Sequence, residues 1–341
     1  MSDADGASPT GAALSRRLAE DLPVMVALRA VIDRGDMRAL LGGALAAPAG
    51  DLALAVLRGA GVVAHGDGAQ WHLTPEAAAL WRRDGPALEA RLRFGLLAAA
   101  DLIQHGGALF SDSQGFVARA ATYGFFRYAR ALGTGAAQIE DTEPWVRYVA
   151  ALNETEAPVL APLVSLAGCR RLLEIGGNAG GFALALLARH PGLQATVLDL
   201  PAVCHIGARA SAAHPAAARL RFAPGDNRSD DWPLEDGGAP DAIVFKSVLH
   251  DWDFARVPEI LSRAARHLAP GGRIFIVERG PMQAEPAISG LSAATNRVFA
   301  PFYRAPEIYA GLLAGLGLVP LPPQSAVLDM TFHIIGAEKP A

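Results

Sequence analysis

The second half of the chain alternates between apolar segments of strand length and amphipathic segments of helix length. The strand-like segments are residues 170–175, 194–200, 219–226, 241–249, 273–280 and 331–339. The helix-like segments between them are residues 180–190, 201–213, 254–268 and 305–314. The central strand segments are continuous apolar runs, which is typical of strands covered on both faces. This alternation predicts an α/β fold with a doubly wound, mostly parallel sheet.

The first half of the chain follows a helical pattern instead. Apolar residues recur there at three- and four-residue spacing, as in residues 22–34, 51–59 and 86–104. Residues 61–65 and 70–74 flank a Gly-Asp-Gly turn and predict a small hairpin, and Thr74 then caps a further helix. Helices followed by a hairpin indicate a winged-helix-like shape. We therefore expect two domains, residues 1–166 and 167–341.

Composition argues against several classes of protein. The 341 residues are 51% hydrophobic and carry a net charge of −4, so nothing in the charge balance indicates binding to nucleic acid or to an anionic membrane. No apolar run is long enough to span a bilayer, and the acidic N-terminus lacks the apolar segment of a signal peptide. Cys169 and Cys204 indicate reduced thiols rather than a disulfide or a zinc site. We expect a cytoplasmic protein without a metal.

A glycine-rich turn follows the first strand segment, in the stretch LLEIGGNAGG at residues 172–181. Such a turn between a strand and a helix usually binds a nucleotide. The dinucleotide fingerprint would need glycine at position 178, where this chain has Asn, so an NAD site is disfavoured but stays open. Glu174, just before the turn, suits a cationic amino-acid group better than a diphosphate, which it would repel by about 1 kcal/mol or more at short range. Asn178 can adopt the left-handed backbone conformation that the turn needs.

Polar residues also follow the next three strand segments. Asp199 is placed to accept hydrogen bonds from ribose hydroxyls, a device that sites for NAD and for S-adenosylmethionine (SAM) share. The sequence GDN at residues 225–227 suits the rim of an adenine site or is an ordinary turn. His250 and Asp251 come directly after the fourth strand segment, at the edge where open α/β sheets bind ligands. They are adjacent in sequence and have no further histidine at ligand spacing, so a metal site is disfavoured.

Five of these segments occur in a fixed order and spacing: LLEIGGNAGG, VLDLPAV, GDN, FKSVLHDW and GGRIFIVE. In this respect the chain resembles the plant-type small-molecule O-methyltransferases and their bacterial relatives, which act on caffeate, flavonoids, acetylserotonin and aromatic polyketides. The resemblance is strong over residues 145–280 and mainly architectural before them. It implies a class I SAM-binding domain, an N-terminal winged-helix-like domain used for dimerisation, and a homodimer that binds no DNA.

The resemblance also implies a set of cofactor-binding residues: Glu174, Gly176, Gly177, Gly180, Asp199, Leu200, Gly225, Asp226, Asn227 and Lys246. Asp199 would accept from the ribose hydroxyls of SAM. Asp226 and Asn227 would flank its adenine, and Lys246 would reach toward the same cofactor. Glu174 would act either directly or through the backbone of the glycine turn.

His250 matches the general base of this family. A neutral imidazole, with an ordinary pKa of about 6.5, can take a proton from a hydroxyl at neutral pH. The methyl group of SAM is already activated by a positively charged sulfur, so in-line displacement needs no metal. Glu278 matches the carboxylate that orients the base, and Asp251 is a candidate for contact with the substrate. The remaining alternative for His250 is a purely structural histidine.

One position departs from the family pattern. Tyr303 stands before Arg304 where the family has a second glutamate, and the neighbouring glycines are absent. The change keeps open N- or C-methylation, or a SAM-assisted reaction without methyl transfer, beside O-methylation of a small aromatic metabolite. A SAM-sensing DNA-binding regulator and a NAD-dependent oxidoreductase remain as alternatives of other classes. The candidate substrate-binding residues are Trp145, Val149, Asn153, Phe299 and Tyr303.

Overall fold

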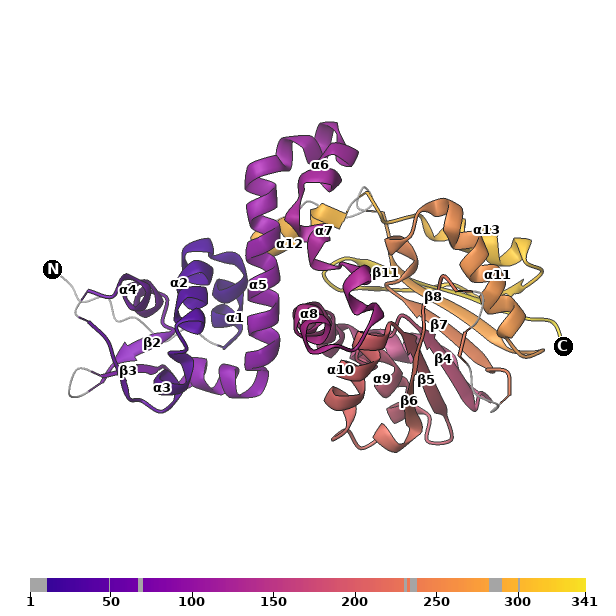
Figure 1. The fold of residues 1–341 in the computed structure, drawn as a ribbon, viewed down its shortest axis with the longest axis horizontal. Helices are drawn as coiled ribbons and strands as arrows, with labels where there is room; N and C mark the ends of the chain where they lie inside the picture. The colour runs from indigo at the N-terminus through magenta and orange to yellow at the C-terminus, as the bar shows by residue number, and fades with distance from the viewer. Residues whose placement is uncertain are drawn as a thin grey trace. The chain divides into compact units, whose positions relative to one another are not determined.

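The computed structural model describes residues 11–48, 50–66, 70–229, 232–233, 238–281, 290–299 and 301–341. The chain forms two compact units (Figure 1). The first unit contains the chain through Gly124 and takes back a later segment that ends at Val298. The second unit begins at Phe125 and contains the rest of the chain, including its C-terminus.

The first unit combines helices with a small antiparallel sheet. Its first elements are α1 (Gly11–Glu20), α2 (Leu22–Asp33), α3 (Met37–Leu41), β1 (Leu45–Ala46), α4 (Leu52–Gly59), β2 (Val63–His65) and β3 (Gln70–Leu73). The strands pair in the order β1-β3-β2, and their core is made by residues such as Leu14, Leu28, Val31, Leu54 and Leu57. The predicted hairpin is confirmed as β2 and β3, whose turn at residues 67–69 lies outside the described residues.

A single long helix, α5 (Pro75–Ser111), follows the hairpin. Thr74 caps it as predicted, since its hydroxyl accepts a hydrogen bond from the Ala77 amide at 3.4 Å. The helical pattern predicted over residues 86–104 is confirmed as part of this helix, which continues through Pro86. A proline inside a helix costs about 3 kcal/mol. Burial of α5 against α1 and α2 offsets that cost.

The first unit is completed by short helices. They are α6 (Ser113–Arg119), α7 (Ala121–Phe125) and α12 (Leu291–Asn296). Helix α12 comes from a distant part of the sequence and packs against α1 and α5. The chain therefore leaves the second unit once after its fifth parallel strand and returns to it at Phe299.

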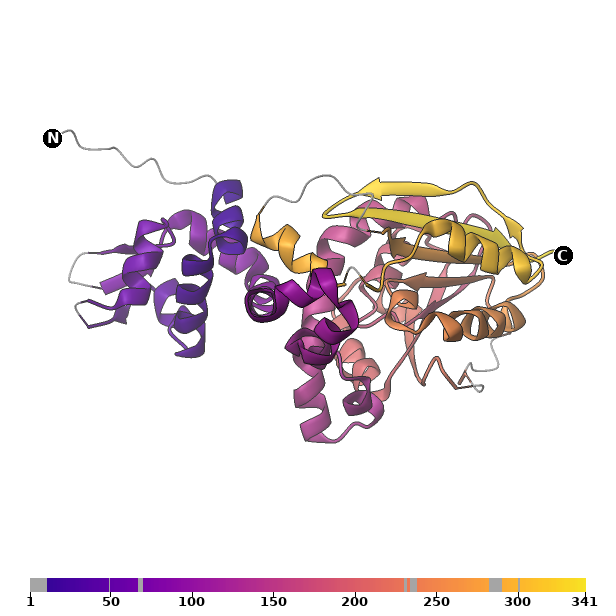
Figure 2. The ribbon, with the colours of Figure 1, turned by 90° about the horizontal axis from the view of Figure 1, so that it is seen from above.

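The second unit is built on an eight-stranded sheet among the described residues. Its strands are β4 (Arg171–Ile175), β5 (Gln194–Asp199), β6 (Leu220–Pro224), β7 (Ala242–Lys246), β8 (Arg273–Arg279), β9 (Val319–Pro320), β10 (Gln324–Val327) and β11 (Thr331–Glu338). Their order is β10-β11-β8-β7-β4-β5-β6, with β9 also paired to β11. Strands β4 to β8 are mutually parallel. At one edge β11 pairs antiparallel with β8, and β9 and β10 pair antiparallel with β11 (Figure 2). The predicted mostly parallel, doubly wound sheet is confirmed.

Helices cover both faces of this sheet (Figure 1). One face carries α8 (Ala136–Leu160), α9 (Gly181–Arg189) and α10 (Pro201–Ser211), and the other carries α11 (Val257–His267) and α13 (Pro306–Gly315). Short 3₁₀ helices join them: η1 (Tyr128–Leu132), η2 (Ala161–Leu163), η3 (Ala217–Arg219), η4 (Leu249–Asp251), η5 (Phe254–Arg256) and η7 (Arg297–Phe299). Ala157 and Leu160 of α8 lie in the core beneath the sheet. The division between units therefore falls before α8, whereas the sequence placed it at residue 166.

The strand order creates one distinctive edge. Strands β4 and β7 are neighbours at the centre of the sheet, and the connections that follow them lead to opposite faces. The loops after the parallel strands therefore separate at the carboxyl edge, which is where open α/β sheets bind ligands. Every cofactor and catalytic residue predicted from the sequence lies on these strands or in these loops.

Candidate active site

The glycine turn after β4 has the backbone geometry that its sequence indicates. Gly176, Asn178 and Gly180 have positive φ angles of 66°, 53° and 75°. A Cβ atom on Gly176 would lie 2.8 Å from a methyl group of Val248, so a larger residue does not fit there. The expectation that Asn178 takes a left-handed conformation is confirmed. The turn leads directly into the N-terminus of α9, where backbone amides and the helix dipole favour ligand groups that accept hydrogen bonds.

Glu174 stabilises this turn through a hydrogen bond and through close packing against one of its glycines. Its side chain is buried, and one carboxylate oxygen accepts a hydrogen bond from the Ala183 amide at 3.0 Å. A Cβ atom on Gly177 would lie 2.7 Å from its carboxyl carbon. Burial raises the pKa of Glu174 to about 8. The geometry favours the second of its two expected roles, which is to hold the turn rather than to touch a ligand.

Asp199 joins the loops after β4 and β5. One carboxylate oxygen accepts from the Leu200 amide and the other from the Asn178 amide, both at 2.7 Å. Burial raises the pKa of Asp199 to about 6, although both hydrogen bonds act against the rise. Each oxygen keeps a second lone pair, which is the capacity needed to accept from a pair of hydroxyls. The amide of Gly225 donates to the Asp199 carbonyl at 2.9 Å and so brings the loop after β6 to the same place.

Asp226 has a partner that the sequence analysis missed. The Arg228 Nε atom lies 2.8 and 2.9 Å from the two carboxylate oxygens of Asp226, and the Arg228 amide donates to the first of them. The Arg228 guanidinium lies 5.4 Å from the ring centroid of Trp252, which follows His250 and Asp251. The side-chain oxygen of Asn227 is buried and has no hydrogen-bond partner among the described residues. The turn after β6 therefore brings three groups together, which are the Asp226 carboxylate, the Arg228 guanidinium and the Trp252 ring.

Lys246 lies in a buried ionic network. Its ammonium group is hydrogen-bonded to Glu156 of α8, and Arg279 at the end of β8 is bonded to the other oxygen of the same carboxylate. All three residues are buried, and Asp329 lies 3.4 Å from Arg279. Burial alone would raise the pKa of Glu156, but Arg279 and Lys246 outweigh it and hold the pKa at about 2. Glu156 and Arg279 were not predicted from the sequence.

His250 is held by Glu278 as predicted. The imidazole Nδ1 lies 2.6 Å from one Glu278 oxygen, and the other oxygen accepts from the amides of Val248 and Leu249 at 2.9 and 2.8 Å. Glu278 is 2% exposed, so its charge is directed at the histidine and the loop rather than at solvent. The arrangement places a proton on Nδ1 and directs Nε2 away from Glu278. Burial lowers the pKa of His250, but Glu278 and Asp251 raise it overall.

Asp251 also contacts the imidazole. Its Oδ1 atom lies 3.3 Å from His250 Nε2, and its Oδ2 atom accepts a hydrogen bond from the Tyr128 hydroxyl at 2.5 Å. Tyr128 belongs to η1, far from Asp251 in the sequence, and was not singled out as a site residue. Burial raises the pKa of Asp251, while His250 and Tyr128 act in the opposite direction. Asp251 thus faces the base and a tyrosine, a position from which it can also meet a substrate.

Aromatic side chains gather beside the base. The ring of Tyr303 lies 5.2 Å from that of His250, and Phe299 lies 6.5 Å from Tyr303. Phe126 connects Phe299 to Trp145 at centroid distances of 6.0 and 6.3 Å. The structure therefore brings together the predicted residues Trp145, Phe299 and Tyr303.

The other two substrate candidates lie closer to the glycine turn. Val149 packs against the apolar cluster that contains Ala179 and Leu200. Asn153 is buried, and a Cβ atom on Gly181 would lie 3.1 Å from the Asn153 Cβ atom. Val149 thus lies beside both the loop after β5 and the aromatic residues Trp145 and Phe126, whereas Asn153 faces the end of the glycine turn.

Several buried polar atoms at this edge have no hydrogen-bond partner among the described residues. They are Asn153 Oδ1, Asn227 Oδ1, Ser247 Oγ and Trp252 Nε1. Buried polar groups in folded proteins are nearly always hydrogen-bonded, so these atoms are available to water or to a polar ligand. Their residues lie on α8 and after β6 and β7, around the loops that hold Asp199 and His250. A nucleoside joined to an amino acid, as in SAM, fits such a donor and acceptor set.

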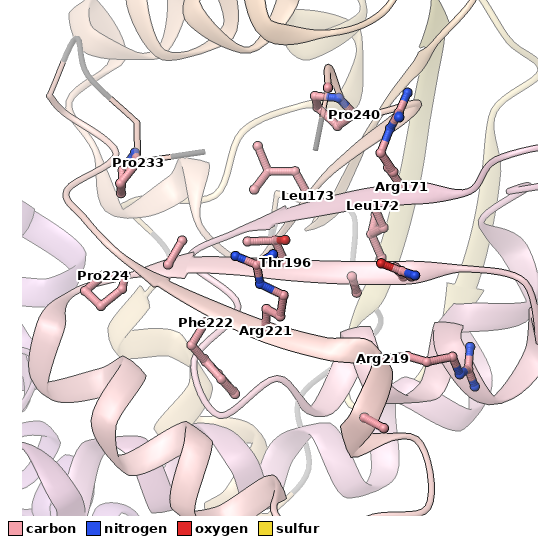
Figure 3. Close-up of a pocket in the computed structure, with 15 residues that line it drawn as sticks. Arg171, Leu172, Leu173, Thr196, Arg219, Arg221, Phe222, Pro224, Pro233 and Pro240 are labelled. Atoms are coloured by element: carbon pink, nitrogen blue, oxygen red, sulfur yellow. The ribbon is translucent and has the colours of Figure 1, made fainter. Parts of the chain in front are cut away.

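A separate cavity of about 320 Å³ lies elsewhere on the sheet (Figure 3). It is lined by the beginnings of β4 and β5 and by β6, with Arg171, Arg219 and Arg221 among its side chains. No predicted site residue lines it. Arg219 is bonded there to carbonyl groups at the end of α9, and Arg171 to the Ala239 carbonyl. Arg171 and Arg219 are thus bound to backbone carbonyls of the neighbouring loop and helix end.

The described part of the chain shows neither a metal-binding cluster nor a membrane-spanning helix. Groups of three or more His, Cys, Asp or Glu side chains placed to hold a metal ion are absent from it. Helices there are too short or too polar to cross a membrane.

Comparison with known proteins places these residues in a family context. The sequence profile of the O-methyltransferase domain matches residues 116–294, more than half of the chain. The 3-hydroxy-5-methyl-1-naphthoate 3-O-methyltransferase of Streptomyces sahachiroi is 38% identical over 119 residues, which are 35% of this chain and 33% of the relative. This chain therefore matches about a third of the length of that relative.

Solved structures show the same fold along the whole chain. The mitomycin 7-O-methyltransferase MmcR superposes with a TM-score of 0.69 and 20% identity, over 96% of this chain and 95% of that one. Human N-acetylserotonin methyltransferase, solved in complex with SAM, superposes with a TM-score of 0.66 and 18% identity over all of both chains. At these identities the likeness is one of fold.

Proposed function

Because the chain belongs to the O-methyltransferase domain family, we propose that it transfers a methyl group from SAM to a hydroxyl of a small aromatic metabolite. The matching relative from Streptomyces sahachiroi, which by name methylates a hydroxynaphthoate, supports an aromatic hydroxyl as acceptor. The alternatives of N- or C-methylation and of a reaction without methyl transfer have less support, since the orienting carboxylate of the base is in place. A NAD-dependent oxidoreductase is disfavoured by Asn178 in the glycine turn and by the family match.

The carboxyl edge of the sheet is the proposed SAM site. SAM supplies, when bound, a methyl group activated by a positively charged sulfur. In our proposal Asp199 accepts from the ribose hydroxyls with its free lone pairs, and Asn227 offers its unpartnered amide oxygen to the adenine. Gly176, Gly177 and Gly180 let the backbone approach the ligand closely, with Glu174 bracing them. Lys246 forms an ion pair with Glu156, and this pair determines the charge of the surrounding part of the SAM site.

His250 is the proposed general base. Its Nε2 atom takes the proton from the acceptor hydroxyl, and Glu278 stabilises the imidazolium that forms. Base catalysis of this kind contributes roughly 10²–10⁴ in rate, and holding the two reactants in line adds to it. The aromatic cluster of Trp145, Phe126, Phe299 and Tyr303 offers flat apolar surfaces for the ring of the acceptor.

Three further properties belong to the same proposal. The first unit is a winged-helix-like dimerisation domain, supported by its helices and its small sheet, and it binds no nucleic acid. Ile103 and Phe110 of α5 support a homodimer, because both are largely exposed and lie two turns apart on one side of the helix. A cytoplasmic place in secondary metabolism agrees with the composition and with the aromatic acceptor.

The observation that carries the proposal is the 2.6 Å contact between His250 Nδ1 and the buried Glu278 carboxylate. The test is methyl transfer from radiolabelled SAM to a panel of hydroxylated naphthoic and benzoic acids. We expect His250→Ala to lower the rate by about 10²–10⁴ while SAM affinity, measured by calorimetry, stays unchanged. The exposed His214→Ala is the matched control. Methyl transfer by His250→Ala at the wild-type rate would contradict the assigned base.

A further inference from the structure

A buried base must return its proton to solvent in every turnover. The His250 side chain is 11% exposed, and Glu278 on its Nδ1 side is 2% exposed. Glu278 already accepts from Val248, Leu249 and His250, so its oxygens are committed to holding the loop and the ring. Tyr303 lies edge-on against the imidazole and carries no charge there, since burial raises the pKa of its hydroxyl further above the neutral range. Neither neighbour can pass the proton to water.

Asp251 has the two contacts that an outlet needs. Its Oδ1 atom lies 3.3 Å from Nε2, the nitrogen that Glu278 leaves available. Its side chain is 35% exposed, so the same carboxylate also reaches solvent. The Tyr128 hydroxyl donates to Oδ2 at 2.5 Å and so fixes which oxygen faces the imidazole.

We propose that Asp251 is the proton outlet of His250 and that Tyr128 is the residue that positions this outlet. As the acceptor oxygen takes the methyl group and the sulfur–methyl bond breaks, the hydroxyl proton moves to Nε2. The imidazolium then passes this proton from Nε2 to Asp251 Oδ1, and the carboxylic acid releases it to water. This inference rests on the proposed function in one respect, namely that the proton comes from the hydroxyl of the methyl acceptor.

The surroundings of the pair agree with this route. Glu278, Asp251 and Tyr303 face the imidazole, and Arg279 lies close enough to oppose its positive charge. Arg304 binds the Leu249 and Trp252 carbonyls on either side of the pair and lies near Asp251. Asp199 and Arg228 lie near Tyr128. Where the family pattern has a second glutamate this chain has Tyr303, so Asp251 and Glu278 are the carboxylates that the described structure places on the ring.

The first test needs neither substrate nor cofactor. The titration of the His250 ring is followed by NMR in the full-length protein, and the signal is assigned by its loss in His250→Asn. We expect Asp251→Asn to lower the pKa of His250 by about one unit or more, because an opposite charge within hydrogen-bond reach shifts a pKa by about 1–3 units. Asp251→Glu should retain most of the wild-type value. An unchanged titration in Asp251→Asn would overturn the proposal.

Tyr128→Phe tests the positioning residue separately. Without the hydroxyl, Asp251 loses a hydrogen bond that stabilises its charge, so the pKa of His250 should fall by less than in Asp251→Asn. Tyr123→Phe is the matched control, because Tyr123 bonds to the Val298 carbonyl in the first unit and should leave the titration unchanged. A Tyr128→Phe titration identical to that of Tyr123→Phe would remove Tyr128 from the proposal.

A second test uses any acceptor from the hydroxylated panel that is methylated. Asp251→Asn should lower kcat at least tenfold, and added formate buffer should restore part of the rate, whereas His250→Ala should stay at its lowered rate with the same buffer. Loss of rate without buffer rescue would contradict an outlet role. A shifted His250 titration without methyl transfer to any acceptor would support the proton contact and contradict the proposed function, so the two failures are distinguishable.

Discussion

Glu278 organises the catalytic loop with a single carboxylate. One of its oxygens holds His250 and the other holds the amides of Val248 and Leu249, which precede the histidine. The same side chain therefore sets the path of the backbone and the tautomer of the ring. Despite its burial, its pKa is lowered, chiefly by His250, so it stays ionised at neutral pH. A carboxylate that orients a histidine and stabilises its protonated form in this way often contributes more to the catalytic rate than one hydrogen bond suggests.

We expect Glu278→Gln to lower kcat by roughly 10²–10⁴. The amide keeps the shape of the side chain but removes the charge that stabilises the imidazolium, so the pKa of His250 also falls. The measurement is the pH profile of kcat with a methylated acceptor, whose acidic limb should move to lower pH. Glu338→Gln, in a partly exposed pair with Arg273 on the neighbouring strands, is the control and should leave the profile unchanged. A profile in Glu278→Gln that matches the control would contradict this role.

The residues at strand ends could be predicted from the sequence, and their distant partners could not. Asp199, His250 and Glu278 could be placed because each lies at or just after the end of a recognisable strand, and parallel strands present such residues at one edge. The roles of His250 and Glu278 came from the resemblance to the O-methyltransferases. Tyr128 and Asp251 are 123 positions apart, and Lys246 and Glu156 are 90 apart. No local pattern reports which residue on another element completes such a pair. Arg228 lies close to Asp226, but only the folded turn shows that its guanidinium returns to that carboxylate.

At the scale of elements, buried ion pairs join helix α8 to the carboxyl edge of the sheet. Glu156 on the helix bonds to Lys246 at the end of β7 and to Arg279 at the end of β8. The aromatic ring of Phe332 lies 4.4 Å from the Arg279 guanidinium and 5.9 Å from the Lys246 ammonium. Two strands and a helix thus share one buried carboxylate. Removing that charge leaves two buried cations next to each other.

We expect Glu156→Gln to destabilise the second unit by about 3–5 kcal/mol, the usual cost of breaking a buried ion pair from one side. Chemical denaturation followed by circular dichroism measures this change. Glu143→Gln on the same helix is the matched control, because its pairs with Arg147 and Arg209 are partly exposed and contribute at most about 1 kcal/mol. Equal stability of the two variants would contradict the assigned network.

The same carboxylate predicts a dependence of stability on pH. The pKa of Glu156 is about 2 in the folded protein, below its ordinary value of 4.5, so folding favours the ionised form. This contribution is fully present above about pH 4.5 and is lost as the pH falls toward 2. The loss of stability over this acid range should be smaller in Glu156→Gln than in the wild type.

The elements themselves were predicted more reliably in the second half of the chain than in the first. Each strand of the parallel core was predicted because continuous apolar runs of strand length alternate with helices. Strands β9 and β10 were missed, since both are short and their side chains are mostly exposed at the sheet edge. Helix α5 was predicted only in part, from its cap at Thr74 and its apolar spacing over residues 86–104, and the pattern did not show that it runs unbroken past Pro86. Only tertiary packing, which no local pattern reports, keeps that helix continuous.

At the scale of the whole molecule, two copies of the chain are proposed to associate. Ile103 and Phe110 are 74% and 84% exposed on α5. Both side chains lie on one face of the helix, where together they offer an apolar surface to a second copy.

We expect the double change Ile103→Lys and Phe110→Lys to convert the dimer into a monomer, since burying each side chain contributes about 1.5–3 kcal/mol per copy. Light scattering after gel filtration measures the mass of the particle. Leu52→Lys, which changes an exposed residue of α4, is the control and should remain dimeric. A monomeric wild-type protein at micromolar concentration would contradict the proposal.

The return of residues 290–298 to the first unit limits how this protein can be engineered. A fragment that starts at Phe125 would retain α12 but lack α1 and α5, the helices against which α12 packs. Exchange of the N-terminal half between relatives by one fusion joint would leave a mismatched α12 in the same way. A chimera that keeps every native contact of α12 needs a joint near Gly124 and two more around the excursion that ends at Val298. Because Phe299 and Tyr303 follow directly, those later joints would also decide the fit of the aromatic cluster.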